Sequence, residues 1–186
     1  VASSATEKQS GHLGPGGSEG YELFDRINVE DTAREAARIA VTMLGAKPCP
    51  AGKIPVVIDN GFGGVIFHEA CGHGLEATAV ARNASVFAGR LGQQIASPLV
   101  TALDDGTIPN GWGSAEMDDE GTPTAKNILI ENGILRSYLV DRLNSRRMHT
   151  AITGSSRRQD YRFAPTSRMT NTFIANGKST PEEIIA

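Results

Sequence analysis

The chain has 186 residues, of which 39% are hydrophobic and 21% charged, so it can bury one ordinary core or part of a larger one. The net charge of −3 argues against a nucleic-acid partner, because phosphate binding needs clustered Lys and Arg. No apolar run reaches the ~18 residues of a membrane span, and the N-terminus lacks a secretory signal, so the sequence predicts a cytoplasmic protein with no membrane partner. Two cysteines, Cys49 and Cys71, do not make a disulfide framework.

The first part of the chain predicts a loop and then a helix. Residues 1–20 are rich in Gly and Ser and are expected to form a flexible segment, from which His12 could reach a metal but is better read as solvated. A helix is expected at about 31–45, with Thr32 and Glu35 as a capping box. Gly45 should end this helix, and the prolines that follow prevent its extension.

A short apolar strand is expected at 54–58, followed by a glycine-rich turn. Such a turn can bind phosphate, but neither the G-x-G-x-x-G spacing nor a following lysine is present. A helix is then expected at about 65–80. It carries the pattern H-E-x-x-x-H in His68, Glu69 and His73.

These three residues suit hydrolysis of an amide by zinc. Neutral imidazoles hold the ion, and a carboxylate takes the proton of a water molecule. The sequence therefore suggests His68 and His73 as metal ligands and Glu69 as the catalytic base. The alternative is that all three are polar residues on the rim of a core helix.

The spacing of the two histidines differs from the common i, i+4 arrangement. At i, i+5 the rings of a regular helix would diverge by about 140°. Convergence therefore requires either a one-residue π-bulge or a helix break near Gly72. Glycines at 72 and 74 make such a distortion inexpensive.

The second half of the chain predicts antiparallel strands and turns. A strand is expected at 99–103, and the acidic residues 118–120 lack the spacing of a calcium loop and are interpreted as a solvated turn. Two apolar runs within 127–140 are joined by Asn132-Gly133, the pair best suited to a type I′ hairpin. A short helix is expected at about 141–148, which completes an α+β fold of mixed helices and antiparallel strands.

The remaining residues combine a basic loop with a helix start. The loop's arginines could hold peptide carboxylates or carbonyl groups, or could simply be solvated; they are Arg157, Arg158, Arg162 and Arg168. A strand is expected at 172–174. Residues 179–183 then read as a capped helix start, but the sequence stops one turn later, which suggests a central fragment of a larger two-domain protein.

Besides the H-E-x-x-x-H-G-L-E stretch of residues 68–76, the chain contains several later motifs, namely Ser85-Val86-Phe87, Asp104-Asp105-Gly106-Thr107, Asp118-Asp119-Glu120-Gly121-Thr122-Pro123, Ile130-Glu131-Asn132-Gly133-Ile134-Leu135 and Arg168-Met169-Thr170-Asn171-Thr172. In these motifs the chain resembles the TldD/PmbA family of metallopeptidases. The resemblance covers nearly the whole chain in order.

The resemblance implies a Zn²⁺-dependent peptidase that hydrolyses unfolded or small peptides, such as modified-peptide precursors and antitoxins. It implies a homodimer, or a heterodimer with a PmbA/TldE-like subunit. It also implies that residues 21–186 are a partial peptidase domain, truncated before a C-terminal domain. On this reading the isolated segment is inactive.

The third metal ligand is left open by the sequence. Catalytic zinc usually has three protein ligands, and the resemblance implies a cysteine outside this segment. Within the segment, Cys71, Glu76 and His149 are the alternatives. A different class of function is a non-catalytic subunit or scaffold of a TldD/PmbA-type dimer, with no metal in this fragment. The metal content of the purified protein would distinguish the two.

Overall fold

The computed structural model describes residues 1–186, except for the Phe62 side chain, and divides them into two compact units, Val1–Val56 and Val57–Ala186. The first unit contains a two-stranded antiparallel hairpin and two helices: β1 (Ala2–Ser3), β2 (Lys8–Gln9), α1 (Leu23–Arg26) and α2 (Val29–Leu44). This division was not expected from the sequence. The predicted ranges 1–20 and 21–186 stay a prediction about the domains of the whole protein.

Helix α2 begins earlier than predicted. Its N-cap is Asn28, whose side chain accepts hydrogen bonds from the backbone N–H groups of Glu30 and Asp31. The predicted capping box was therefore wrong: the Thr32 hydroxyl donates to the Asn28 carbonyl, and Glu35 pairs with an arginine one turn later. Asn28 supplies a stronger cap than Thr32 because its carboxamide reaches two free donors at once. The helix ends at Gly45, as predicted.

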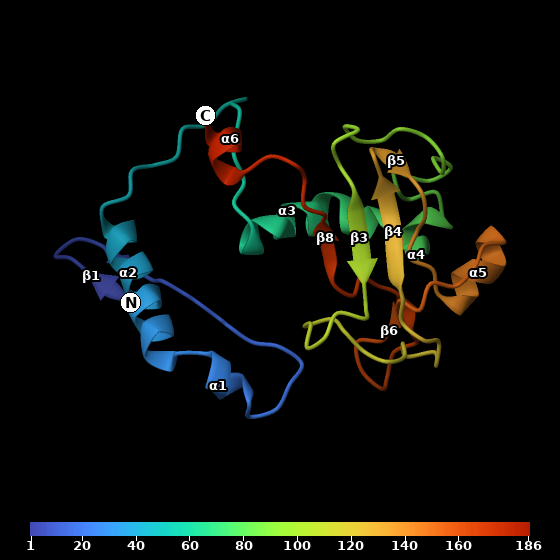
Figure 1. The fold of residues 1–186 in the computed structure, drawn as a ribbon, viewed down its shortest axis with the longest axis horizontal. Coiled ribbons are helices and arrows are strands. Elements are labelled where there is room, and N and C mark those ends of the chain that lie inside the picture. The colour runs from blue at the N-terminus through green and yellow to red at the C-terminus, as the bar shows by residue number, and fades with distance from the viewer. The chain divides into compact units, whose positions relative to one another are not determined.

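The second unit is built on a four-stranded antiparallel sheet in the order β5-β4-β3-β8 (Figure 1). Its strands are β3 (Ala102–Asp105), β4 (Lys126–Glu131), β5 (Ile134–Leu135) and β8 (Thr172–Ile174), and a separate small hairpin joins β6 (Ser156–Arg157) to β7 (Thr166–Ser167). The strand predicted at 99–103 begins only at Ala102. Strand β8 is an edge of the sheet and pairs only with β3 among the described strands.

The predicted Asn-Gly hairpin is present between β4 and β5. Asn132 and Gly133 both have positive φ, at 50° and 82°, as a type I′ turn requires. A side chain at position 133 would also collide with the carbonyl oxygens of Ala96 and Ser97. The glycine is therefore required both by the backbone conformation and by the close approach of a second segment.

The helical segments of this unit are short: η1 (Gly61–Gly64), α3 (Val65–Phe67), η2 (His68–Gly72), η3 (His73–Leu75), α4 (Ala77–Val80), α5 (Arg142–Met148) and α6 (Pro181–Ile185). The predicted helix at 141–148 is confirmed as α5, and α6 starts with the expected cap, a capping box of Thr180 and Glu183. The strand predicted at 54–58 does not form, and the side chains there are exposed. No helix among the described residues is long and apolar enough to cross a membrane.

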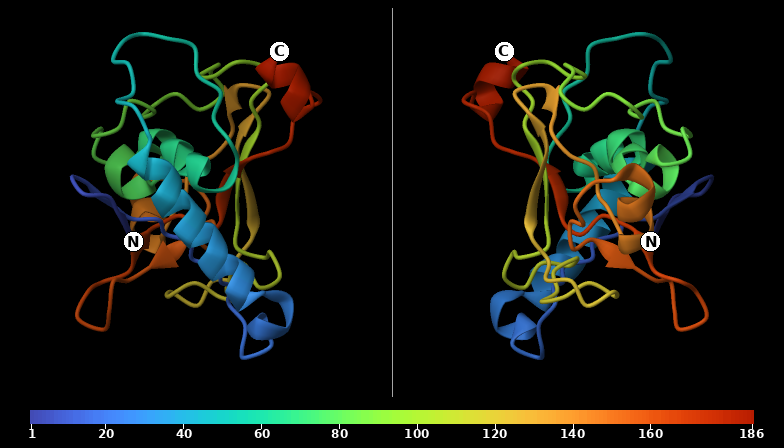
Figure 2. Two further views of the ribbon diagram at one scale, coloured as in Figure 1. Left: turned by 90° about the vertical axis from the view of Figure 1, so that its left-hand side faces the viewer. Right: turned by 90° about the vertical axis from the view of Figure 1, so that its right-hand side faces the viewer.

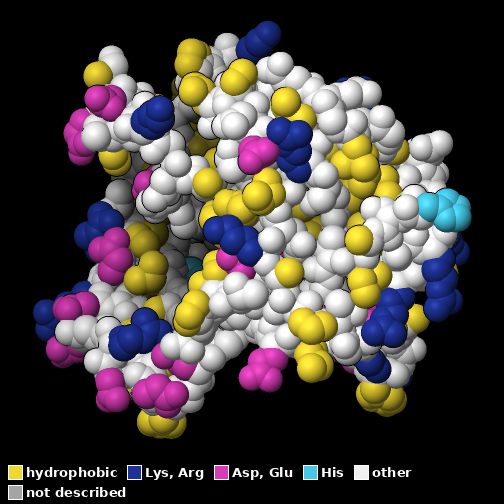
Figure 3. All heavy atoms as spheres, turned by 45° about the vertical axis from the view of Figure 1, so that its right-hand side comes forward, with side chains coloured by type: hydrophobic (Ala, Val, Ile, Leu, Met, Phe, Trp, Pro, Cys, Tyr) yellow, Lys and Arg dark blue, Asp and Glu magenta, His cyan; other side chains and the backbone are white. Residues whose placement is uncertain are grey.

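The core of the second unit lies between the sheet and the segment that carries the histidines. Figure 2 shows the sheet nearly edge-on, with α3, α4 and α5 on the same face. Apolar side chains from the sheet meet apolar side chains from the helical turns, including Leu75, Val80, Leu129 and Leu139. Other hydrophobic side chains stay open to solvent and lie among charged ones on the surface, as Figure 3 shows. The α+β class with antiparallel strands is confirmed.

Candidate metal centre

The segment 65–80 is not one helix. It runs as an α turn (α3), a π turn (η2) and a 3₁₀ turn (η3), and it breaks at Glu76, whose φ of −71° and ψ of 127° are extended. The helix predicted at about 65–80 is present only as these short turns. Of the two predicted distortions, a π-bulge or a break near Gly72, the structure has the π-bulge: η2 spans His68–Gly72 and widens the turn between the two histidines.

The glycines of this segment serve a different purpose from the one predicted. Gly72 has an ordinary helical conformation, with φ of −54° and ψ of −53°, so its backbone freedom is not used. A methyl group there would instead collide with the Met169 sulfur, and one at Gly74 would collide with the Phe87 ring. The glycines allow the distorted turns to pack closely against the rest of the unit.

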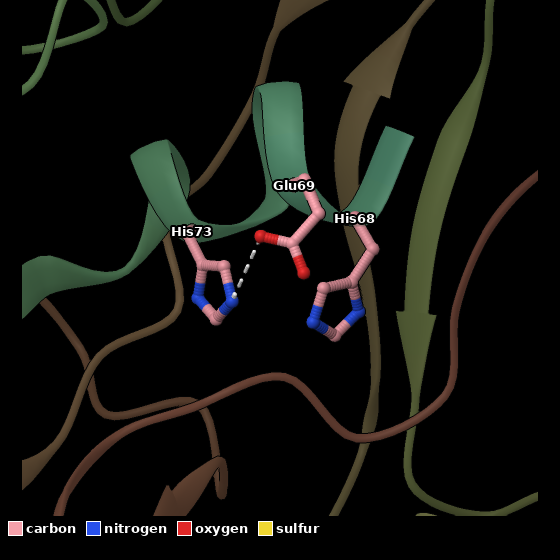
Figure 4. A group of neighbouring side chains, drawn as sticks. All are labelled: His68, Glu69 and His73. Atoms are coloured by element: carbon pink, nitrogen blue, oxygen red, sulfur yellow. Dashed lines mark ion pairs between the residues drawn. The ribbon is translucent and has the colours of Figure 1, made fainter. Parts of the chain in front are cut away.

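The widened turn brings His68, Glu69 and His73 together, as Figure 4 shows. The two imidazole rings lie edge to face with their centroids 4.8 Å apart. One potential ligand atom from each of the three residues lies within 4.8 Å of the others, and His73 Nε2 is 3.9 Å from Glu69 Oε2.

This arrangement fits a divalent metal ion. Two nitrogens that share a tetrahedral zinc at about 2.0–2.1 Å lie roughly 3.3 Å apart, a spacing that small side-chain rotations can reach from here. The donor set of two imidazoles and a nearby carboxylate is typical of a zinc site with open positions.

The three side chains differ in their exposure. Both histidines are partly buried and Glu69 is exposed, so a substrate could approach the carboxylate from solvent. The opposite side of the same turns packs into the core through Phe67 and Leu75. The core thus fixes the backbone of the turns while the polar face stays open.

The alternatives for a third ligand do not join this group. No other His, Cys, Asp or Glu of the described residues belongs to the cluster of three. Cys71 packs against the hydrophobic core, and burial raises the pKa of its thiol. Glu76 lies at the Nδ1 side of His73, away from Glu69. His149 ends α5 in the left-handed region, with φ of 52°.

The arginines of the basic loop have partners within the chain, whereas binding a peptide would need unpaired arginines. Arg158 pairs with Asp119, Arg162 with Asp160, and Arg157 donates to the Met169 carbonyl. Arg168 lies 3.4 Å from the Glu76 carboxylate. This last contact links segments 92 residues apart, and sequence spacing offered no signal for it.

The acidic turn is also more structured than predicted. The Asp118 carboxylate accepts hydrogen bonds from the backbone N–H groups of Glu120, Thr122 and Ser156. The prediction of a solvated turn was therefore wrong for Asp118, because its carboxylate closes the loop and ties it to β6. Such internal use of both oxygens argues for a structural role.

A cavity of about 610 Å³ lies along the other side of the histidine segment. It is lined by η1, by the apolar side of α3 and η2, and by the edge strand β8. The larger apolar side chains of the lining are those of Ile58, Ile66, Phe67, Cys71, Phe173 and Ile174. The cavity is mostly apolar and does not include the two histidines.

Comparisons with known proteins give the family. Residues 51–186 match the sequence model described as the PmbA/TldA metallopeptidase C-terminal domain. The metalloprotease TldD homolog of Buchnera aphidicola is 44% identical over 186 residues, which cover 96% of this chain and 38% of that protein. The chain therefore spans well under half the length of this relative.

Two solved structures are also similar. A Thermotoga maritima protein described as a modulator of a DNA gyrase has a TM-score of 0.72 and 29% identity, over 87% of this chain and 36% of that one. TldE from Thermococcus kodakarensis has a TM-score of 0.56 and 30% identity, over 62% of this chain and 26% of that one. With the histidine segment and the antiparallel sheet described above, these matches establish that the chain belongs to the TldD/PmbA family of metallopeptidases.

Proposed function

We propose that the protein containing this chain is a zinc-dependent peptidase, with His68 and His73 as metal ligands and Glu69 as the general base. The observation that carries the proposal is the π turn of η2, which brings both imidazoles and the carboxylate to one place. An i, i+5 pair on a regular helix would not converge, so the distortion suits a shared ion.

A zinc ion at this place would polarise the scissile carbonyl group and acidify a water molecule. Glu69 would take the proton from that water and pass it to the leaving amine, which makes it acid and base in turn. Its exposure lets it reach a bound peptide, while His68 and His73 hold their positions through the buried side of the same turns. Cys71 does not join the cluster of three, so we propose a third ligand from outside this chain segment, as the resemblance implies.

An extended peptide is the substrate form that suits the surroundings best. Strand β8 presents an unpaired edge among the described strands, and the apolar cavity lies beside that edge. Backbone hydrogen bonds to an edge strand select unfolded segments rather than folded proteins. We therefore propose small or unfolded peptides as substrates, including modified-peptide precursors and antitoxins.

The likeness to TldE supports a further part of the proposal, a homodimer or a heterodimer with a related subunit. The domains of the whole protein and its cytoplasmic location stay predictions. No contact among the residues of the site favours the alternative function, a scaffold without metal.

The test is the metal content and activity of the full-length protein. We expect about one zinc per chain, loss of cleavage of an unstructured peptide after treatment with a chelator, and recovery when zinc is added back. A folded protein that binds no zinc, or that cleaves equally well after its metal is removed, would contradict the proposal.

A further inference from the structure

Glu76 is a buried carboxylate with an unusual pair of neighbours. Only 6% of the residue is exposed. Its Oε1 lies 3.1 Å from His73 Nδ1, and its Oε2 lies 3.4 Å from Arg168 Nη1. Although Glu76 is the residue before α4, its side chain makes no capping hydrogen bond to that helix. The carboxylate is turned to the imidazole instead.

The contact with Glu76 determines which ring nitrogen of His73 carries the proton. A carboxylate accepts hydrogen bonds, so the nitrogen that faces it must carry the ring proton. This leaves the lone pair on Nε2, the nitrogen that faces Glu69. A neutral imidazole with a free Nε2 is the form that binds a metal ion. The ring is thus held in the tautomer and in the direction that the proposed site requires.

The backbone of Glu76 is also fixed. The residue forms a parallel bridge with Leu139, flanked by hydrogen bonds from Ala77 N to Leu139 O at 2.8 Å and from Leu139 N to Leu75 O at 2.9 Å. Leu75, Ala77 and Leu139 are fully buried in the core. The carboxylate therefore extends from a backbone position that hydrogen bonds to Leu139 fix on both sides.

Arg168 completes the arrangement from the other side. It follows β7, and its backbone N–H donates to the Ser155 carbonyl at 2.8 Å, which fixes where the side chain starts. Its guanidinium is partly exposed, yet it approaches the carboxylate that the core has buried. An opposite charge at this distance offsets part of the cost of burying Glu76.

We infer that Glu76 is a positioning residue for His73, and that Arg168 holds Glu76 in place. The inference deepens the proposed function and rests on it. His68 has no hydrogen bond that orients its ring within the part of the chain that the structure describes, so the support is specific to His73. Glu76 touches neither the proposed ion nor the substrate, and it acts through the imidazole.

The test measures zinc affinity of the full-length protein by competition with a chromophoric chelator. Removing an outer partner of a ligating histidine typically lowers metal affinity 10–100-fold, and we expect about this loss for Glu76→Ala. Glu76→Gln should recover part of it, because the amide oxygen can still accept from Nδ1. Arg168→Ala should weaken binding by a smaller factor than Glu76→Ala, and Arg168→Lys should restore it in part.

The matched control is Asp104→Asn, which alters another fully buried carboxylate of the same unit that has no contact with a histidine. It should leave zinc affinity within about twofold of the native value. The visible spectrum of the cobalt-substituted protein gives a second measurement, and its ligand-field bands should change for Glu76→Ala and not for the control.

The outcomes separate this inference from the proposed function. Native protein that binds zinc and cleaves peptide, with the same affinity and cobalt spectrum after Glu76→Ala, would overturn the role of Glu76 alone. Native protein that binds no zinc would overturn both. If Glu76→Ala fails to fold, Glu76→Gln and Arg168→Ala decide, and unchanged zinc affinity in both would reject the inference.

Discussion

The histidine segment and the central sheet each bury a carboxylate, and the two are satisfied in different ways. In the segment, Glu76 meets an imidazole and a guanidinium. In the sheet, Asp104 accepts hydrogen bonds only from the Thr170 backbone N–H and from the hydroxyls of Thr170 and Thr172, at 2.6–2.8 Å. Both carboxylates are almost fully removed from water.

The difference distinguishes a carboxylate inferred to orient a proposed metal ligand, Glu76, from one that stabilises the fold, Asp104. Asp104 ties β3 to Thr170, just before β8, and to Thr172 in β8, and none of its three side-chain hydrogen bonds involves the histidine cluster. Glu76 is linked through one ring to a cluster that faces solvent. Changes in the histidine segment should therefore alter metal binding and catalysis, and changes around Asp104 should alter stability alone.

The largest effect is expected for Glu69→Gln in the full-length protein. Glutamine keeps the shape of the side chain and loses the base, so zinc should stay bound while peptide cleavage falls roughly 10²–10⁴-fold. Elemental analysis and initial rates give both quantities. Asp104→Asn should cleave at nearly the native rate, and cleavage by Glu69→Gln at the native rate would remove this carboxylate from the mechanism.

A second large effect is expected for His73→Ala. Loss of a strong ligand costs several kcal/mol of the apparent ~10–16 kcal/mol of a complete structural zinc site, so affinity should fall roughly 10²-fold or more. The matched control is His149→Asn, which replaces an exposed histidine at a left-handed position that asparagine tolerates. Equal loss of zinc in both variants would show that the effect is not local to the cluster.

The pH dependence of stability tests the structural role of the buried Asp104 carboxylate in the sheet. Burial raises the pKa of Asp104 above its ordinary value of 3.8, although the threonine hydrogen bonds oppose the rise. The folded protein then binds the proton more tightly than the unfolded chain does. The stability from this group is fully present below pH 3.8 and is lost as the pH rises through the raised pKa.

Asp104→Asn isolates this contribution, because asparagine does not titrate. The free energy of unfolding of native protein minus that of the variant, measured by urea titration at a series of pH values, should decrease as the pH rises above 3.8. The slope cannot exceed about 1.4 kcal/mol per pH unit for one group. A difference that is constant with pH would mean that Asp104 titrates alike in the folded and unfolded states.

The sequence predicted the elements whose signals are local. The Asn132-Gly133 turn, the α5 helix and the end of α2 at Gly45 follow from residues within a few positions of each other. The H-E-x-x-x-H spacing also predicted a distortion, either a π-bulge or a break near Gly72, because the rings would diverge on a regular helix, and the structure has the π turn. The expected strand at 54–58 failed since a strand needs a partner, and none of the described strands pairs with it.

The surroundings of the site were less accessible to sequence reasoning. The contact of Arg168 with Glu76 joins residues 92 positions apart, and the exact fit of Gly72 against Met169 joins residues nearly 100 positions apart. Such contacts depend on how the sheet and the helical turns pack, which no local pattern encodes. The three residues of the cluster could thus be predicted, while the contact of Arg168 with Glu76 could not.

The smallest effect expected concerns two glycines of the helical segment. A methyl group at Gly72 meets the buried Met169 side chain, which must shift, so Gly72→Ala should destabilise the protein by about 1–3 kcal/mol. Gly64 is the matched control, since it is also helical, with φ of −60°, and nothing lies within 4 Å of an added methyl group. Gly64→Ala should be neutral or stabilise by about 0.4–1 kcal/mol. Urea unfolding of both variants without metal gives these values. If Gly72→Ala and Gly64→Ala change the free energy of unfolding equally, the close packing at Gly72 does not stabilise the π turn. The histidine segment would then be less constrained than its contacts indicate.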